Sequence, residues 1–331
     1  MIDVVVINSM HSTKPGWASY SEALDQTAYL DEHGASHIIL PEHHNINNGY
    51  MPSPMLWGAA IATRTKNIRL RPMVIVPLLD PIRVAEDALV LDNISNGRLE
   101  LSMLLGYRPS EYTMFGTTQR ERVPRLEAAT AVIRKAFTNE PFEHNGKTVA
   151  VGPKPVQPGG PPLLFGGNSV PAARRAARLG DGYFAGGGDL ELNNEWVQTY
   201  RDECKRLGKE PGKTFIPTVQ HVQVSEDPEK TWHEIGRYFY NDLRVYSQFT
   251  SEATSVTSPY SSSDPNALSL DAVKAAGIHL ILTPDECIEY ARSLESDGHS
   301  LIVNPQSGGL PPEYGWEGIE LLVNKVLPAL A

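Results

Sequence analysis

Three titratable side chains, Glu42, His43 and His44, stand together where the apolar run of residues 36–40 ends. Such groups are costly inside an apolar core, whereas at the end of a strand they can face a pocket. The trio could bind a metal, act as an acid or base, or form a packed hydrogen-bond network. Neighbouring side chains of an extended segment point in opposite directions, so both histidines cannot easily bind one ion. No second carboxylate–histidine cluster stands at another strand end, and we therefore expect no metal.

A second candidate site is the segment "FGGNS", which ends another apolar run. Its glycines, Gly166 and Gly167, let the backbone come close to a ligand. Asn168 and Ser169 open a helix, whose first N–H groups and partial positive charge favour a phosphate monoester. The alternative is a plain glycine turn with a serine cap. These features predict a pocket with a phosphate-binding helix start, one imidazole and apolar walls formed by residues 74–79. Such a pocket suits a flat aromatic cofactor better than a metal.

The rest of the chain must position these residues, and its strand and helix signals alternate. Helix starts are predicted at Ser53, at Asp80 and at Thr283, which forms a capping box with Glu286. Eight strand–helix repeats favour a (β/α)8 barrel, in one domain of residues 1–331, over an open sheet. No dinucleotide-binding G-x-G-x-x-G follows the first strand. The strands are expected at residues 2–8, 36–41, 67–77, 98–104, 161–167, 180–187, 214–224 and 300–305.

In barrels of this kind the chemistry lies where the strands end and the next loops begin. The candidate residues at the other expected strand ends are Asn8 and His11, Pro77 to Asp80, Leu104 to Arg108, Gly186 to Gly188, His221 and Asn304.

One segment interrupts the alternation of strands and helices. Residues 247–269 are rich in serine and threonine and almost without apolar periodicity. Loops of this length are usually lids or disordered inserts. Because the segment follows the seventh expected strand, we expect a lid over the catalytic face, with an idle surface insert as the alternative.

Composition narrows the class of protein. The formal net charge is −10 and the pI is about 5.5, which disfavours nucleic acid as a partner. No apolar run approaches the roughly 20 residues of a membrane helix, and no basic leader precedes the first strand. Two cysteines, Cys204 and Cys287, fit a reducing compartment. We therefore expect a cytoplasmic protein that binds neither nucleic acid nor a membrane.

The motifs together resemble those of the bacterial luciferase-like flavin-dependent monooxygenases. The resemblance runs from residue 2 to about residue 187 and more loosely to the end, with six motifs in the family's order and spacing. They are "PEHH", "SPMLWGAAIATRTKNIRL", "DPIRVAEDALVLDNISNGRLEL", "LGYRPSEYTMFG", "ERVPRLEAA" and "PPLLFGGNSVPAARRAARLGDGYFAGG".

The resemblance implies a luciferase-like TIM barrel, usually a homodimer, that uses reduced FMN from a separate flavin reductase. Dioxygen would add to the flavin as a C4a-peroxide, which oxidises a small, largely apolar organic substrate. Two alternatives stay open on the same barrel. One is a reductase or dehydrogenase that depends on a flavin or on the deazaflavin F420, and the other is a non-enzymatic flavin-binding relative.

The resemblance also assigns roles to residues. His43 would be the catalytic acid or base, with Glu42 and His44 shaping its surroundings and Glu42 setting its orientation or proton affinity. Arg122 or Arg125 would assist at the phosphate, and Leu79 is a further candidate beneath the flavin ring. Bulk at Leu104 and Leu105 would either tune the pocket or weaken FMN binding. The cofactor-binding residues are expected to be Pro77, Leu78, Leu104, Gly106, Tyr107, Gly166, Gly167, Asn168, Ser169 and Gly186.

Overall fold

Strands and helices alternate along the chain in a computed structural model that describes residues 4–10, 17–186, 190–215, 217–252, 269–296 and 299–330. The strands are β1 (Val4–Ile7), β2 (His37–Leu40), β3 (Arg69–Ile75), β4 (Leu101–Leu104), β5 (Phe142–His144), β6 (Lys147–Val149), β7 (Leu163–Gly166), β8 (Gly182–Phe184), β9 (Lys213–Phe215), β10 (Pro217–Val224), β11 (His279–Leu282) and β12 (Ser300–Val303). The helices are α1 (Trp17–Glu32), α2 (Pro54–Arg64), α3 (Pro81–Ile94), α4 (Pro109–Met114), α5 (Arg122–Phe137), α6 (Val170–Leu179), α7 (Leu190–Arg206), α8 (Pro228–Ser251), α9 (Leu270–Ala275), α10 (Pro284–Ser296), α11 (Pro312–Leu321) and α12 (Leu327–Leu330).

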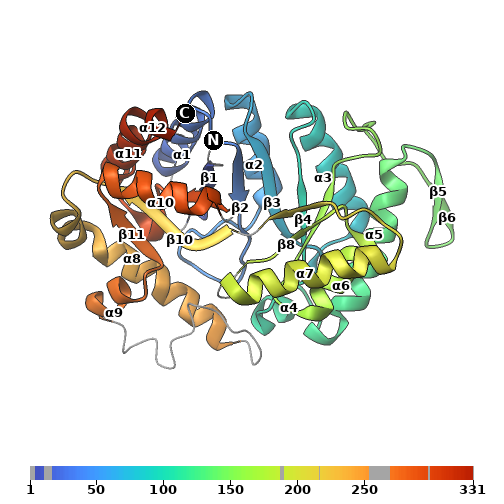
Figure 1. The fold of residues 1–331 in the computed structure, drawn as a ribbon. Coiled ribbons are helices and arrows are strands. Elements are labelled where there is room, and N and C mark those ends of the chain that lie inside the picture. The colour runs from blue at the N-terminus through green and yellow to red at the C-terminus, as the bar shows by residue number, and fades with distance from the viewer. Residues whose placement is uncertain are drawn as a thin grey trace.

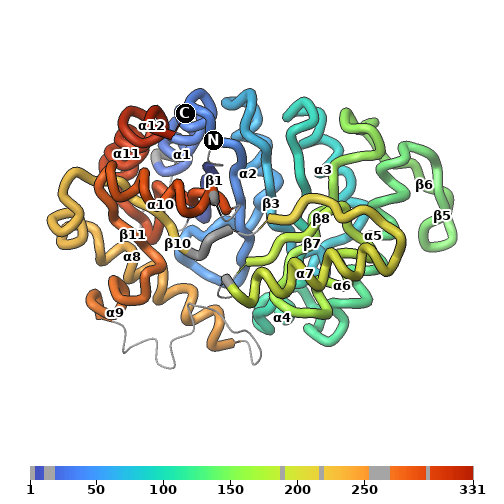
Figure 2. Tube along the Cα trace, viewed as in Figure 1, coloured from blue at the N-terminus to red at the C-terminus, as the bar shows by residue number. Residues whose placement is uncertain are grey.

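The main sheet is parallel and closes on itself. Its order runs β11-β10-β12-β1-β2-β3-β4-β7-β8-β9. β9 pairs with β8 at one end of this order, and β10 pairs with β12 near the other. Because β9 ends at Phe215 and β10 begins at Pro217, the two ends meet and the sheet forms a barrel. β1 also pairs with β12, so the first and last strands lie side by side. Figure 2 shows helices from the two ends of the chain as neighbours too, with α1 (blue) beside α11 (red). The predicted TIM barrel is confirmed.

Three details of the strand pattern differ from the sequence prediction. The seventh strand is divided into β9 and β10, and the β5–β6 hairpin, which projects from one side of the molecule (Figure 1), was not expected. β11 is an additional strand on the far side of β10 from β12, with His221 opposite His279. Its four residues, His279–Leu282, form an apolar run too short for periodicity to separate helix from strand. Its pairing with β10 shows that this run is a strand.

The sequence predicts where helices start more accurately than it predicts how strands pair. The Asp80 carboxylate accepts hydrogen bonds from the first turn of α3, 2.8 Å from the nitrogen of Ile82. Thr283 and Glu286 form the predicted capping box, with a distance of 2.8 Å from the Thr283 nitrogen to Glu286 Oε2. Ser53 precedes α2 as expected, but its side chain makes no capping bond. A short side chain at such a position contributes about 1 kcal/mol when it caps.

The expected irregular segment, residues 247–269, begins as helix. α8 runs from Pro228 to Ser251, so the prediction is wrong for residues 247–251. Their apolar anchor is Phe249, which is buried against other rings. Ser269 is the N-cap of α9. Residues 253–268 lie outside the described part of the chain. Within the described residues, no helix combines the length and apolar character needed to cross a membrane.

The amino-terminal end of the barrel contains a buried ion network. Glu100, which is 2% exposed, accepts hydrogen bonds from Arg71 Nη2 at 2.5 Å and from Arg69 Nε at 2.6 Å. Arg71 lies over the ring of Phe215, 4.3 Å from its centroid. Burial raises the pKa of the Glu100 carboxyl, but the charge of Arg71, with those of His37 and Arg69, lowers it by more, to about 2.

Candidate active site

The imidazole of His43 is the centre of a buried network where β2 ends. His43 is 6% exposed, and its Nδ1 lies 2.8 Å from Oε1 of Glu111, which is fully buried. Burial raises the pKa of the Glu111 carboxyl, but the hydrogen bond and charge of His43, the backbone N–H of His44 and the charge of Arg108 lower it by more. Glu111 is therefore an ionised acceptor, and the Nδ1 of His43 holds a proton.

The other nitrogen of His43 faces Tyr107. Its Nε2 lies 3.1 Å from the Tyr107 hydroxyl. When Nδ1 carries the proton that Glu111 accepts, the Nε2 lone pair can accept a hydrogen bond from that hydroxyl. Tyr107 is held in turn, because Gln119 donates from Nε2 to its backbone oxygen at 2.7 Å.

His44 points away from this pair, as an extended segment requires. Its Nε2 lies 2.9 Å from Oε1 of Glu42, and Glu42 Oε2 accepts from the backbone N–H of Ile75 at 2.5 Å. Glu42 thus joins the end of β2 to the end of β3. The sequence prediction gave His43 the wrong acidic neighbour: Glu111 supports His43, and Glu42 supports His44.

Arg108 connects this network to the end of α8. Its Nη1 donates to the backbone oxygen of His44 at 2.7 Å, and its Nη2 donates to Oε1 of Glu252 at 2.7 Å. Glu252 Oε2 also accepts from Ser110 at 2.5 Å. The guanidinium lies over the ring of Phe249, 4.2 Å from its centroid. The carboxyl end of α8 therefore packs directly on the start of α4, the helix that contains Glu111.

Aromatic rings surround His43 on its remaining sides. The nearest is Phe249, with ring centroids 4.3 Å apart. The hydroxyls of Tyr50 and Tyr246 lie 2.6 Å from each other. The ring contacts of His43 are with Tyr50, Tyr107, Tyr246 and Phe249. An imidazole in such surroundings is shielded from bulk water and faces apolar surface.

The residues that follow or end β3, β4 and β7 are in close contact with one another. Gly106 has a φ of +72°, and a Cβ there would lie 2.7 Å from Ile75 Cγ2, so the turn after β4 requires glycine. A Cβ on Gly166 would collide with the side chain of Leu104. The side chain of Leu104 therefore lies against Gly166, at the end of β7.

The start of α6 has the features expected of a phosphate site. Ser169 is its N-cap and accepts from the Ala172 nitrogen at 3.4 Å. Asn168 Oδ1 accepts from the Gly186 nitrogen at 3.1 Å, which joins the ends of β7 and β8. Among the described residues, the backbone N–H groups of Asn168, Ser169 and Val170 have no hydrogen-bond acceptor. The N–H of Gly167 is used, because it donates to the Phe184 oxygen at 3.2 Å.

The remaining predicted residues have structural partners. Pro77 and Leu78 form a short 3-10 turn after β3, and Leu78 is 6% exposed. Arg122 donates to the Gly106 oxygen at 3.1 Å, and Arg125 donates to the Pro77 oxygen at 2.7 Å. Both arginines fix strand-end turns through these carbonyls.

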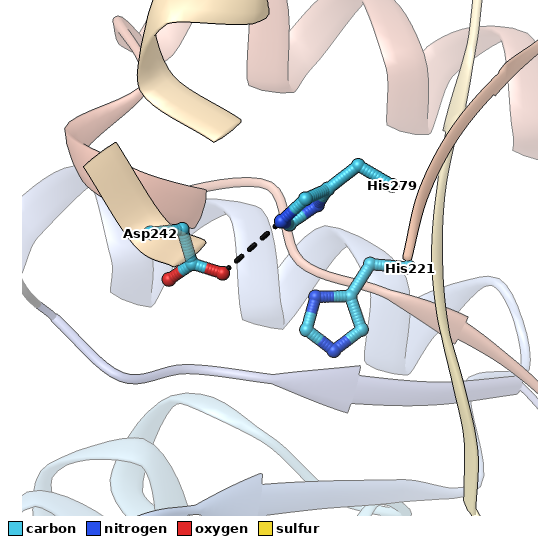
Figure 3. A group of neighbouring side chains, drawn as sticks. All are labelled: His221, Asp242 and His279. Carbon is cyan, nitrogen blue, oxygen red and sulfur yellow. Dashed lines mark ion pairs between the residues drawn. The ribbon is translucent and has the colours of Figure 1, made fainter. Parts of the chain in front are cut away.

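Two groups of residues escaped the sequence prediction. Glu111 stands 68 positions after His43, on a six-residue helix, and nothing local in its sequence marks it. His221, Asp242 and His279 also meet, under α8 rather than at the carboxyl end of a strand (Figure 3). His221 was expected at a strand end, but it lies inside β10, which runs to Val224.

Comparison with known proteins identifies the family. A sequence model of the luciferase-like monooxygenases matches residues 3–300, and the chain belongs to this family. It is similar to the oxygenase component of the flavin-dependent trigonelline monooxygenase of Acinetobacter baylyi, with 24% identity over 94% of this chain and 90% of the relative.

Solved structures share the fold over the full chain. The monooxygenase RslO1 from Streptomyces bottropensis superposes with a TM-score of 0.82, 22% identity and 100% of both chains covered. The oxygenating constituent of 3,6-diketocamphane monooxygenase from Pseudomonas putida, in complex with FMN, gives 0.74, 18% identity and coverage of 99% and 98%. An F420-dependent secondary alcohol dehydrogenase gives 0.73, 18% identity and coverage of 100% and 99%.

Proposed function

We propose that the chain is the oxygenase component of a two-component monooxygenase that uses reduced FMN and dioxygen to oxidise a small, largely apolar organic substrate. The main support is one observation: a buried imidazole, His43, offers one nitrogen to an aromatic surrounding while an ionised carboxylate holds the other. The named relative, the trigonelline monooxygenase component, supports the class of reaction.

The residues at the strand ends fit FMN. The open N–H groups of Asn168, Ser169 and Val170 face outward from the start of a ten-residue helix, as a phosphate monoester requires. The backbone would approach FMN closely at the glycines Gly166, Gly167 and Gly186. The flavin ring would be bordered by Pro77, Leu78, Leu104, Gly106 and Tyr107. When bound, reduced FMN supplies the electrons that activate dioxygen.

His43 would hold and move the proton of the reaction at Nε2. Glu111 favours the protonated ring, because a carboxylate 2.8 Å from Nδ1 stabilises the positive charge that forms when Nε2 takes a proton. The Tyr107 hydroxyl has to turn from Nε2, or pass its own proton, before another group can exchange a proton there. Phe249 and the tyrosines exclude water and strengthen these interactions.

The proposal includes a separate flavin reductase, a homodimer and a cytoplasmic location. The relative's description as an oxygenase component supports the first. Both cysteines are buried and free, which fits a reducing compartment.

An F420-dependent dehydrogenase is the second candidate, because the likeness to the F420 enzyme is almost as strong as that to the FMN complex. A paired binding experiment separates them. Affinity for reduced FMN and reduced F420 is measured anaerobically, and air is then admitted. We expect tighter binding of reduced FMN and its reoxidation with a rate that depends on His43. Tighter binding of reduced F420 without oxygen consumption would establish the alternative, and FMN binding with no effect of enzyme on its reoxidation would indicate a non-enzymatic flavin carrier.

A further inference from the structure

Three side chains that commonly bind metals meet on the outer side of the barrel, apart from the His43 network. His221 lies on β10 and His279 on β11, opposite each other in the parallel register. Asp242 comes from α8, which covers both strands. One ligand atom from each of the three lies within 4.8 Å of the other two. Figure 3 shows His279 directed at the Asp242 carboxylate, with the ring of His221 beside both.

The three residues are deeply buried. His221 is 9% exposed, and His279 and Asp242 are 1% exposed each. His279 Nε2 lies 3.2 Å from Asp242 Oδ2, and its ring is stacked on Phe239, with centroids 4.4 Å apart and planes 4° apart. His221 Nδ1 and both ring nitrogens of His279, including the Nε2 that faces Asp242, have no hydrogen-bond partner among the described residues. Buried polar atoms normally have partners, so these orphaned nitrogens need an explanation.

The types of side chain suit a metal ligand set. Two imidazoles and one carboxylate from three different elements bring one ligand atom each to a common point. Imidazole nitrogens and carboxylate oxygens are common ligands of transition metals.

We propose that His221, Asp242 and His279 bind one divalent transition metal ion of the zinc class. A tetrahedral Zn²⁺ with bonds of about 2.0–2.1 Å holds its ligands about 3.3 Å apart. The distance of 3.2 Å from His279 to Asp242 already matches such an edge. The remaining separations, at most 4.8 Å, close by a side-chain movement of about 1.5 Å or less. Two nitrogens and one carboxylate oxygen favour zinc, cobalt or nickel over calcium or magnesium.

The ion would clamp α8 onto β10 and β11. Asp242 is two turns before Phe249, which packs on His43, and Phe249 is followed by Glu252, which binds Arg108. A metal that fixes Asp242 therefore fixes the element that closes the His43 network. Three protein ligands leave the fourth tetrahedral position to a water molecule, and the role we assign to the ion is to hold α8 in place.

Metal binding to the intact chain tests the proposal. Protein freed of metal with EDTA and desalted is titrated with Zn²⁺ in a calorimeter, and Co²⁺ is added separately to record its visible absorption. We expect one Zn²⁺ per chain, a Co²⁺ spectrum of low-coordinate type, and a higher melting temperature with Zn²⁺ than without it. Absence of binding to the wild-type chain would overturn the proposal and leave the three residues as an internal ion pair.

Matched variants locate the ion. Loss of a residue that only supports a ligand weakens metal binding by about 10–100-fold, so Asp242→Asn and His279→Gln should each weaken Zn²⁺ binding by at least about tenfold. His233→Gln is the control, because His233 is an exposed histidine on the same helix, and it should leave affinity unchanged. Equal Zn²⁺ affinity in all four proteins would place the ion elsewhere and refute the site. The wild-type Co²⁺ spectrum keeps the test decisive should a variant fail to fold.

Discussion

The two ends of the barrel contain similar residues in different arrangements. At the amino-terminal end, both oxygens of Glu100 accept hydrogen bonds from the permanently charged Arg69 and Arg71. At the carboxyl end, Oε1 of Glu111 receives three donors, from His43, His44 and Arg108, while its Oε2 has no donor among the described residues. One carboxylate is saturated, and the other has capacity left.

This difference separates a structural network from one that can react. Arginine stays charged at every physiological pH, so the pairs that Glu100 makes with Arg69 and Arg71 do not change state. Imidazole can both accept and donate a proton, so the pair of Glu111 and His43 can take part in proton transfer. In (β/α)8 barrels the amino-terminal face serves stability and the carboxyl-terminal face serves chemistry, and the two carboxylates follow that division.

Removing His43, the histidine that pairs with Glu111, should produce the largest effect on turnover. We expect His43→Ala to fold and to bind FMN, yet to lose about 10²–10⁴ in turnover with reduced FMN, because proton transfer by a positioned side chain contributes about that much. His44→Ala is the matched control at the adjacent position, and its turnover should fall less. A parallel loss of turnover and melting temperature in both variants would indicate that the histidines are structural.

Breaking the network at the other end should instead cost stability. Glu100→Gln leaves Arg71 buried without its counter-ion, and we expect the free energy of unfolding to fall by about 3–5 kcal/mol. Denaturant unfolding of the wild type and the variant measures the difference. FMN affinity of the folded variant should be unchanged. A change in the midpoint equivalent to less than about 1 kcal/mol would show that the pair is as weak as an exposed one.

The Glu100 carboxylate should also make the free energy of unfolding depend on pH. Its pKa falls from an ordinary value of 4.5 to about 2 in the folded chain. A depressed carboxyl pKa stabilises the fold above the unfolded value, and this contribution is lost as the pH falls from 4.5 towards 2. The full contribution is about 3 kcal/mol. Unfolding measured at several pH values should show this loss in the wild type and a smaller slope in Glu100→Gln; equal slopes would assign the acid sensitivity to other groups.

These two carboxylates also show what the sequence could and could not predict. The alternation of elements predicted the barrel, and capping residues such as Asp80 and Thr283 predicted helix starts, because both depend on local periodicity and hydrogen bonds. Glu111 could not be predicted, since its partner His43 is 68 positions away and only the folded barrel brings them together. His279 and Asp242 escaped for the same reason: β11 is defined by pairing with β10, which no local pattern reveals.

Weakening the support of His43 without removing the ring should have an intermediate effect. Glu111→Gln keeps the shape but replaces the negative charge with an amide, so the protonated imidazole is less stable. We expect turnover to fall by roughly tenfold or more, less than the loss of about 10²–10⁴ expected for His43→Ala, and its pH profile to differ from that of the wild type, because the amide does not stabilise the charge that forms on the ring. Glu42→Gln, which alters the neighbour of His44, is the control. A pH profile that matches the wild type would mean that Glu111 only fills space.

The smallest expected effect concerns the start of α6, and the chain supplies its own control. Aspartate caps helices as well as serine does, so Ser169→Asp and Ser269→Asp should preserve α6 and α9, each of which begins at a serine cap. Only at α6 would the new charge face a phosphate. We expect Ser169→Asp to weaken FMN binding by about tenfold, or about 1.4 kcal/mol, and Ser269→Asp to leave it unchanged.

Riboflavin, which has no phosphate, should bind wild type and both variants alike in a fluorescence titration at one salt concentration. Loss of riboflavin and FMN binding together would show that Ser169→Asp disturbs the pocket as a whole, and unchanged FMN binding would place the phosphate away from α6.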